Sequence, residues 1–238
     1  MLETIKVFIG LDEPYKIVYD VCKYSILKNN KKYNLDIIPI NYNTVKDYNR
    51  VKDQYESTQF SFARFWTPFE SDFKGVSIFL DSDFLFLDSI DSLIDLYDEE
   101  KAIMCCKHNY KPTNSKKMDN KVQTVYPRKN WSSLIIFNNS HPKNKILEPF
   151  MLNTSTGSYL HRFSWLDDED IGDLPLQWNW LTDWYSETED FKPKALHYTE
   201  GGPWLDNYKD CKYNKHWDSI KNEFKYKNLR NEYEWHNI

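Results

Sequence analysis

The opening of the chain alternates between strand and helix patterns, and this order limits the folds that it can adopt. Residues 5–9 form a strand pattern rich in β-branched side chains, which Gly10 closes. Apolar residues then recur at helical spacing over about 14–28, with Pro14 in the first turn. A second strand pattern follows at 35–40. Because a strand, a helix and a strand in this order form a parallel pair with a right-handed crossover, the opening predicts an α/β fold.

Further patterns extend this prediction to the rest of the chain. Strands are predicted at 76–80, 102–106, 133–137 and 193–197. Helices are predicted at 60–66, ending near Pro68, and at 89–98, 143–152 and 175–187. The segment 107–129, with seven Lys or Arg residues and one Asp, is predicted to be a mobile basic loop. No linker rich in Pro, Gly or Ser divides the chain, so we expect one α/β domain over 1–205 and a helical extension over 206–238 packed on it.

The charge balance and the hydropathy narrow the expected partners and location. Lys and Arg number 31 against 36 Asp and Glu, a net charge of -5, which disfavours tracking along a nucleic-acid backbone. No stretch approaches the roughly 18 consecutive apolar residues of a membrane span, and the first residues lack the pattern of a signal peptide. We therefore expect no nucleic-acid partner, no transmembrane segment and a cytoplasmic location. The tail at 206–238 carries seven Lys or Arg against six Asp or Glu, so peripheral attachment at the cytoplasmic membrane face stays open as an alternative.

An acidic triplet is the first candidate for chemistry. The chain has only six glycines, and their positions exclude glycine-rich phosphate loops, so a phosphate ligand would need a metal ion or side chains. Asp81, Ser82 and Asp83 directly follow the apolar strand pattern at 76–80. Ligands of open α/β sheets bind at the carboxyl ends of strands, and two carboxylates there favour magnesium or manganese. An acidic turn that caps the helix predicted near Ser89 is the alternative.

A second group of residues follows the last predicted strand. His197 ends that strand, and Gly201, Gly202, Pro203 and Trp204 come shortly after it. Adjacent glycines let a ligand approach the main chain closely. An imidazole added to two carboxylates would shift the metal preference from magnesium toward manganese. A histidine that only forms structural hydrogen bonds is the alternative.

With these residues the chain resembles nucleotide-sugar-dependent glycosyltransferases of the GT-A fold. The resemblance rests on Asp81-Ser82-Asp83 after its apolar strand, on the turn from His197 to Trp204, and on Arg64 in the helix before the acidic strand. It is nearest to family 8, the glycogenin and bacterial lipopolysaccharide galactosyltransferase group, and spans about residues 4–205. The resemblance implies a Rossmann-like domain with a mixed central sheet. It also implies transfer of a sugar from a nucleotide-sugar, expected to be a UDP-sugar, to a carbohydrate or glycoconjugate acceptor.

The resemblance further implies roles for individual residues. Asp81, Asp83 and His197 would hold Mn²⁺ or Mg²⁺. The donor-binding residues would be Ile9, Asp12, Arg64, Asp81, Ser82, Asp83, Gly201, Gly202 and Trp204. A carboxylate or amide beneath the sugar ring would stabilise an oxocarbenium-like transition state, and Asp168, Asp170 and Gln177 are candidates by their location. The family pattern ends in Lys-Pro-Trp, whereas Gly202 precedes Pro203 here, so Arg64 or a lysine of 107–129 would be the cation beside the leaving diphosphate.

Two other classes of function fit part of the pattern. In a haloacid-dehalogenase-type phosphatase, Asp81 would be the nucleophile and Asp83 the acid/base. Such proteins begin with the strand that precedes the triplet and carry Thr or Val where Leu85 stands here. A non-catalytic carbohydrate-binding module would explain the 17% aromatic residues without a metal. Manganese-dependent hydrolysis of a nucleotide-sugar separates the three classes.

Overall fold

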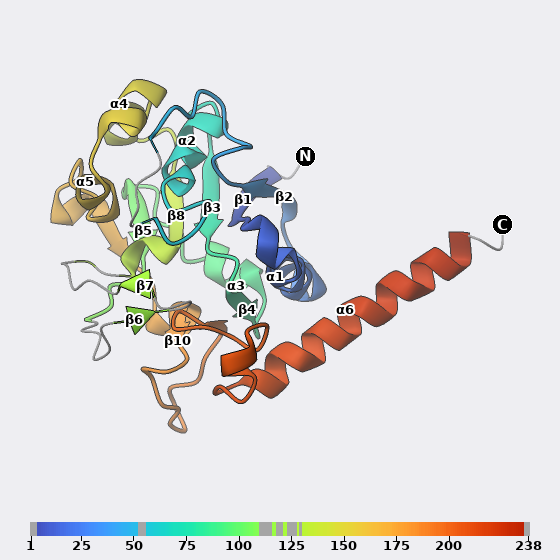
Figure 1. Ribbon diagram of the computed structural model, residues 1–238. Coiled ribbons are helices and arrows are strands. Elements are labelled where there is room, and N and C mark those ends of the chain that lie inside the picture. The colour runs from blue at the N-terminus through green and yellow to red at the C-terminus, as the bar shows by residue number, and fades with distance from the viewer. Residues whose placement is uncertain are drawn as a thin grey trace.

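The computed structural model of the chain describes residues 4–51, 56–109, 116–117, 121–122, 128 and 130–235. Within these residues the main feature is a six-stranded mixed sheet, which confirms the predicted α/β class (Figure 1). Strand β8 alone runs against the others, because it pairs antiparallel with both of its neighbours. In spatial order the strands are β2 (Asn34–Ile40), β1 (Thr4–Gly10), β3 (Val76–Leu80), β8 (Leu134–Asn138), β5 (Ile103–Cys105) and β9 (Ile171–Asp173).

Helical layers cover both faces of this sheet. The side chains of β1 alternate between the faces: Val7 and Ile9 pack in one apolar cluster and Phe8 in another. The first cluster joins the sheet to α1 (Lys16–Asn29) and α3 (Ile90–Ile94). The second joins it to the 3₁₀ helix Ala63–Trp66, α2 (Thr67–Glu70), α4 (Pro149–Thr154) and α5 (Gly157–His161). Burial on both faces explains why the central strands are largely apolar in sequence.

The strand register determines where a site can form. Ile9 of β1 lies opposite Leu80 of β3, so these two parallel strands end at the same edge, which we call the carboxyl edge. Antiparallel β8 begins at this edge, since Leu134 also lies opposite Leu80. A smaller sheet contains β4 (Phe84–Phe86), β11 (Ala195–His197) and β10 (Trp180–Leu181). The acidic triplet connects β3 of the large sheet to β4 of the small sheet, so it lies where the two sheets meet.

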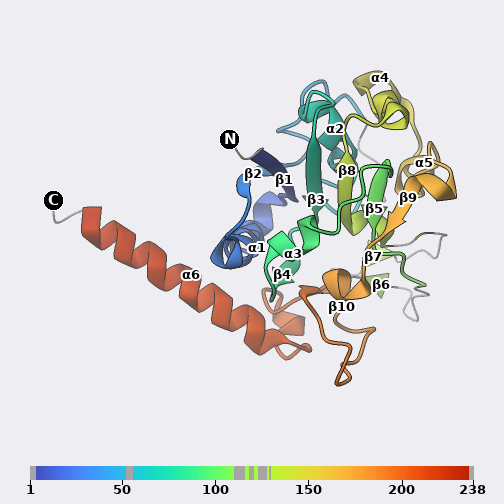
Figure 2. The ribbon, with the colours of Figure 1, turned by 180° about the vertical axis from the view of Figure 1, so that it is seen from behind.

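A long helix, α6 (Asn214–Trp235), follows the last strand. Its first part packs on the domain, because Trp217 is buried and Glu223 accepts a hydrogen bond from Tyr24 and pairs with Lys28 of α1. Figures 1 and 2 show the remainder of α6 extending away from the body of the molecule. None of the helices in the described part of the chain combines the length and the hydropathy of a bilayer-spanning segment.

The structure differs from the predicted elements in several segments. The helix predicted to end near Pro68 continues through it, because Pro68 stands in the first turn of α2, where its missing N–H costs nothing. The helix predicted at 175–187 is wrong: the chain forms a short 3₁₀ helix, Leu176–Asn179, and then β10, which pairs with β11. The helix predicted at 143–152 is split into a 3₁₀ helix, Pro142–Ile146, and α4. Most of the basic loop predicted at 107–129 lies outside the described residues, although β6 (Lys116–Lys117) pairs with β7 (Lys121–Val122).

Candidate metal site

The turn between β3 and β4 presents two carboxylates at the carboxyl edge. The backbone N–H of Asp81 donates to the carbonyl of Ser133 at 2.9 Å, and the carbonyl of Asp83 accepts from the N–H of Tyr198 at 3.1 Å. Ser82 between them is buried, whereas the side chains of Asp81 and Asp83 are each 17% exposed. Backbone bonds to two distant segments therefore hold the turn, while both carboxylates keep some access to solvent.

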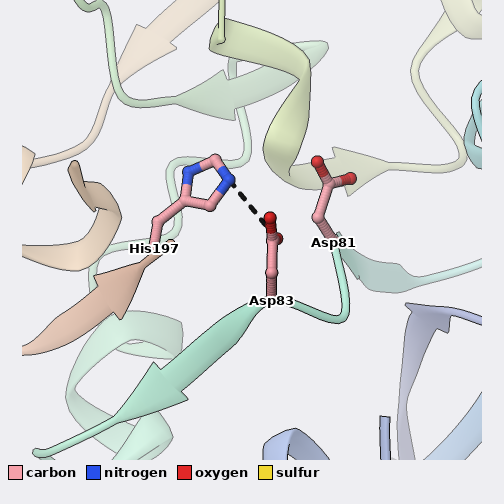
Figure 3. A group of neighbouring side chains, drawn as sticks. All are labelled: Asp81, Asp83 and His197. Atoms are coloured by element: carbon pink, nitrogen blue, oxygen red, sulfur yellow. Dashed lines mark ion pairs between the residues drawn. The ribbon is translucent and has the colours of Figure 1, made fainter. Parts of the chain in front are cut away.

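Strand β11 brings His197 to the same place from a distant part of the sequence. His197 pairs with Phe84 across the antiparallel β4–β11 ladder, and its side chain is 2% exposed. The imidazole stacks on the Phe84 ring, with centroids 4.4 Å apart and planes inclined by 16°. Its Nε2 lies 3.4 Å from Oδ1 of Asp83, as Figure 3 shows. Strand pairing and stacking thus hold the imidazole against the acidic turn.

These three side chains fit a single divalent cation. Asp81, Asp83 and His197 each offer one ligand atom, and these atoms lie within 4.8 Å of one another. Opposite ligands of an octahedral Mg²⁺ ion are about 4.2 Å apart, because each bond is about 2.1 Å long. Carboxylates suit magnesium and manganese, and imidazole is a common ligand of transition metals. The structure therefore brings together the residues that the sequence singled out as metal ligands.

Arg64 forms an ion pair with the acidic turn. Its side chain is 7% exposed, and Nη1 forms an ion pair with Oδ1 of Asp81 at 2.9 Å. The same guanidinium donates to the carbonyls of Ser132 and Ser61, at 2.8 and 3.0 Å, and lies over the ring of Phe79. These contacts orient Asp81 and offset part of its negative charge.

Buried polar side chains stand behind His197. Its Nδ1 lies 2.7 Å from Oδ1 of Asn179, whose Nδ2 donates to Oγ of Ser133 at 2.8 Å. The hydroxyl of Ser133 donates to the carbonyl of Asn130 at 2.7 Å. This chain of bonds connects the imidazole to the segment that precedes β8.

A second imidazole, His108, was not among the predicted site residues. It is buried after β5 and bonds to the hydroxyl of Tyr185 at 2.8 Å. Burial, and secondarily the nearby His197, lowers the pKa of His108 to about 3. His108 is therefore neutral at physiological pH and adds no positive charge near the carboxylates. Its position just after a predicted strand was the one sequence signal that could have drawn attention to it.

Three of the predicted donor-binding residues lie along the end of the large sheet. Ile9 is buried within β1 opposite Leu80, and Ser82 is buried in the acidic turn. Asp12 follows β1 at the carboxyl edge, where its carbonyl accepts a hydrogen bond from the N–H of Tyr15. Asp12 and the acidic turn therefore follow neighbouring parallel strands, as a ligand site at this edge requires.

The glycine turn after β11 is closely packed. Gly201 has a φ of 137°, and a Cβ at Gly202 would lie only 2.0 Å from the ring of Trp204. Trp204 itself packs edge to face on Tyr198 and also against Trp217 of α6. The turn thus needs both glycines for its own packing, and their contact with a donor stays a prediction.

The structure does not bring Asp168 or Asp170 to the metal ligands. Both belong to a 3₁₀ helix that precedes β9, and because β9 is parallel to β5 this helix lies toward the amino ends of those strands. Asp170 pairs with Lys143 at 2.6 Å, and Asp168, with 90% of its side chain exposed, pairs with Arg128. Their catalytic role stays a prediction made from sequence location.

The backbone of Gln177 lies at the start of β11, since its carbonyl accepts from the N–H of Lys194, which precedes that strand, whereas His197 ends it. Two residues later in the same 3₁₀ helix, Asn179 contacts the imidazole directly. The catalytic role of Gln177 stays a prediction.

Comparisons of sequence show what the chain is similar to. No model of a known protein family matches the chain. The chain is 46% identical over 234 residues to Protein CDI of Arabidopsis thaliana. The matched region covers 96% of this chain and 90% of that protein.

Solved structures of glycosyltransferases share the fold. The chain is similar to the apo structure of the bifunctional glycosyltransferase WbbM, with a TM-score of 0.63 and 17% identity over 92% of this chain and 49% of that chain. For the glycosyltransferase GlyE of Streptococcus pneumoniae TIGR4 the TM-score is 0.57, with 15% identity over 94% of this chain and 63% of that chain. For the galactosyltransferase LgtC in complex with donor and acceptor sugar analogs the TM-score is 0.57, with 12% identity over 92% of this chain and 95% of that chain. The chain spans less than two thirds of the WbbM and GlyE chains. The similarity in fold confirms the predicted GT-A fold.

Proposed function

We propose that this chain, which belongs to the family of Protein CDI from Arabidopsis thaliana, is a metal-dependent glycosyltransferase that moves a sugar from a nucleotide-sugar to a carbohydrate or glycoconjugate acceptor. One observation carries the proposal: two carboxylates and an imidazole offer ligand atoms within 4.8 Å of one another where a GT-A sheet ends. The donor proposed is a UDP-sugar, and the cation proposed is Mn²⁺ in preference to Mg²⁺, because one of the ligands is a nitrogen. Family 8 is the proposed glycosyltransferase family.

The chemistry follows from the charge of the leaving group. When the bond between the anomeric carbon and the phosphate breaks, new negative charge appears on the diphosphate, and a divalent cation bound to Asp81, Asp83 and His197 would offset it. Arg64 holds Asp81 in place through the 2.9 Å ion pair. Because the chain lacks a phosphate loop, the cation site is the part of the described structure best suited to bind a diphosphate.

The order of elements weighs against the phosphatase alternative. Such phosphatases begin with the strand that precedes the acidic triplet, whereas here β1, α1 and β2 precede β3. The neighbouring structures are glycosyltransferases, which also favours the transferase. A binding module without a metal leaves unexplained why the two carboxylates and His197 converge.

The test is a calorimetric titration of UDP into the protein with Mn²⁺ and with EDTA. We expect tight binding with Mn²⁺ and more than about tenfold weaker binding with EDTA, since a cation held by Asp81, Asp83 and His197 would offset the charge of the diphosphate. Asp83→Asn and His197→Ala should weaken binding in Mn²⁺ and slow sugar transfer by about 10²–10³. Equal UDP affinity with Mn²⁺ and EDTA would refute the proposal.

Two matched variants control for nonspecific damage. Asp88→Asn changes a carboxylate that follows β4 and pairs with Lys194. This carboxylate is not one of the three candidate metal ligands. His216→Ala removes an exposed imidazole from α6. Both should bind UDP and Mn²⁺ as the unmodified chain does. A loss of the same size in either control would show that the effects of Asp83→Asn and His197→Ala do not report metal ligation.

A further inference from the structure

We infer, building on the proposed function, that Asn179 and Ser133 are positioning residues that hold His197 in the tautomer with its proton on Nδ1, so that the lone pair of Nε2 is free for the metal. Neither residue need touch the substrate. Their effect passes through the imidazole, which Asn179 contacts at 2.7 Å.

The direction of each hydrogen bond follows from a fixed acceptor. The backbone carbonyl of Asn130 can only accept, and the Ser133 hydroxyl at 2.7 Å has one hydrogen, so this hydrogen points to Asn130. The oxygen of Ser133 is then left as an acceptor for Asn179. The atom of Asn179 that lies 2.8 Å from it is therefore the amide nitrogen, and the amide oxygen faces His197.

The amide orientation in turn determines the tautomer. Because Oδ1 of Asn179 is an acceptor, Nδ1 of His197 must carry the hydrogen of the 2.7 Å bond. A neutral imidazole has one such hydrogen, so Nε2 presents a lone pair. The side chains of Asn179, Ser133 and His197 are at most 3% exposed, so water cannot replace these bonds. A flipped amide would set its own oxygen against the oxygen of Ser133, acceptor against acceptor, which buried groups avoid.

The resulting arrangement suits a cation. Nε2 lies 3.4 Å from Oδ1 of Asp83, so in this tautomer two acceptors face each other. A cation held by His197 and Asp83 would satisfy both, whereas the other tautomer would direct an N–H toward Asp83. Partners that hydrogen-bond the second nitrogen of a metal-binding histidine fix its orientation in this way, and their loss typically lowers metal affinity about 10- to 100-fold.

The segment that carries Ser133 also holds a second ligand. The carbonyl of Ser133 accepts from the backbone of Asp81, and the carbonyl of Ser132 accepts from Arg64, which pairs with Asp81. Ser133 therefore contacts the Asp81 side of the site through its backbone and the His197 side through its hydroxyl. Any residue could supply the backbone contact, so it is the hydroxyl, bonded to Asn179 and Asn130, that requires a serine here.

The tautomer can be observed directly by NMR of protein labelled with ¹⁵N-histidine. Spectra are recorded without metal at alkaline pH, and the His197 signal is assigned by its loss in His197→Ala. We expect the hydrogen on Nδ1 in the unmodified protein and in Asn179→Asp, whose carboxylate still accepts. We expect it to move to Nε2 in Asn179→Leu, and in part of the molecules in Ser133→Ala, where the amide is free to flip. A hydrogen on Nε2 in the unmodified protein would overturn the inference.

Metal affinity supplies the second measurement. Titration with Mn²⁺ should show affinity about 10- to 100-fold lower in Asn179→Leu, with recovery toward the original value in Asn179→Asp. The matched control is Asn144→Leu, because Asn144 is equally buried and donates to the carbonyls of Ala102 and Asn138 at the opposite end of the sheet. An equal loss in Asn144→Leu would overturn the positioning role.

The two measurements separate this inference from the proposed function. If the unmodified protein has its hydrogen on Nδ1 but binds no Mn²⁺, the proposed metal function fails and the purpose assigned to the tautomer fails with it. If the protein binds Mn²⁺ but Asn179→Leu changes neither the tautomer nor the affinity, the positioning role fails and the proposed function stands.

Discussion

The ion pair between Arg64 and Asp81 gives a sharp prediction for stability. Replacing Arg64 by Met keeps much of the apolar volume over Phe79 but leaves the Asp81 carboxylate in a largely buried place without its counter-charge. It also removes the donors to the carbonyls of Ser132 and Ser61. We expect Arg64→Met to be strongly destabilising in the absence of metal.

The size of this effect follows from burial. Removing one partner of a buried ion pair costs about 3–5 kcal/mol. The side chain of Arg64 is 7% exposed, but that of Asp81 is 17% exposed, so water screens the remaining charge to some degree. The expected loss is therefore about 3 kcal/mol, near the lower end of that range. Asp81→Asn should also destabilise, because it leaves Arg64 buried without a counter-charge.

A double-mutant cycle measures the pair itself. Urea unfolding of the metal-free protein gives the free energy of unfolding for Arg64→Met, Asp81→Asn and the double variant. We expect the double variant to lose less than the sum of the single losses, by about 1–3 kcal/mol. The exposed pair of Lys16 and Asp20, with the lysine side chain 67% exposed, is the control and should couple by about 0.5 kcal/mol or less. Additive losses at Arg64 and Asp81, or a loss below about 1 kcal/mol in Arg64→Met, would refute the reasoning.

Further predictions concern the packing and the surface. Gly202→Ala should lower the free energy of urea unfolding by about 1–3 kcal/mol, because its Cβ would lie 2.0 Å from the Trp204 ring; an unchanged value would contradict the packing of the turn. Lys28 lowers the pKa of Glu223 below its usual 4.5, so the pair stabilises the protein above that pH and the stability is lost as the pH falls through the lowered pKa. Glu223→Gln should therefore lose less stability than the original chain between about pH 5 and 3 in thermal unfolding. Burial raises the pKa of Cys211 to about 11, and the other cysteines are fully buried, so a thiol reagent should modify Cys211 alone in the folded protein, slowly at neutral pH and faster as the pH rises.

The sequence predicted the core of the fold because its strands carry strong local signals. Residues 76–80 are apolar except for Ser77, and the structure places them as a central strand between β1 and β8. The rule that ligands meet the carboxyl ends of strands then placed Asp81 and Asp83 correctly at the edge where β1 and β3 end. His197 was joined to them as the end of another predicted strand and by the resemblance, since the β4–β11 pairing that brings it there is three residues long and leaves no periodic signal.

Other parts could not be predicted because tertiary contacts decide them. The short segment Trp178-Asn179-Trp180 carries no periodicity that distinguishes a helix from a strand. The pairing of Trp180 with Leu196 makes its end a strand. The catalytic roles expected for Asp168 and Asp170 rested on sequence location alone, and the order of strands in the sheet puts their 3₁₀ helix away from the metal ligands. No pattern in the sequence singled out Asn179. Its contact with the imidazole depends on the 3₁₀ helix Leu176–Asn179, which directly precedes β10.

The packing of α6 connects the tail of the chain to the candidate site. His197 ends β11, and the next residue, Tyr198, donates its backbone N–H to Asp83 and packs on Trp204. Trp204 in turn packs against Trp217, which α6 buries in the same apolar cluster. Gly201 and Gly202, which lie between His197 and Trp204, give the turn room for these rings, so they serve the contact between the α/β domain and its C-terminal helix. Packing therefore accounts for both glycines, and their contact with a donor stays a prediction.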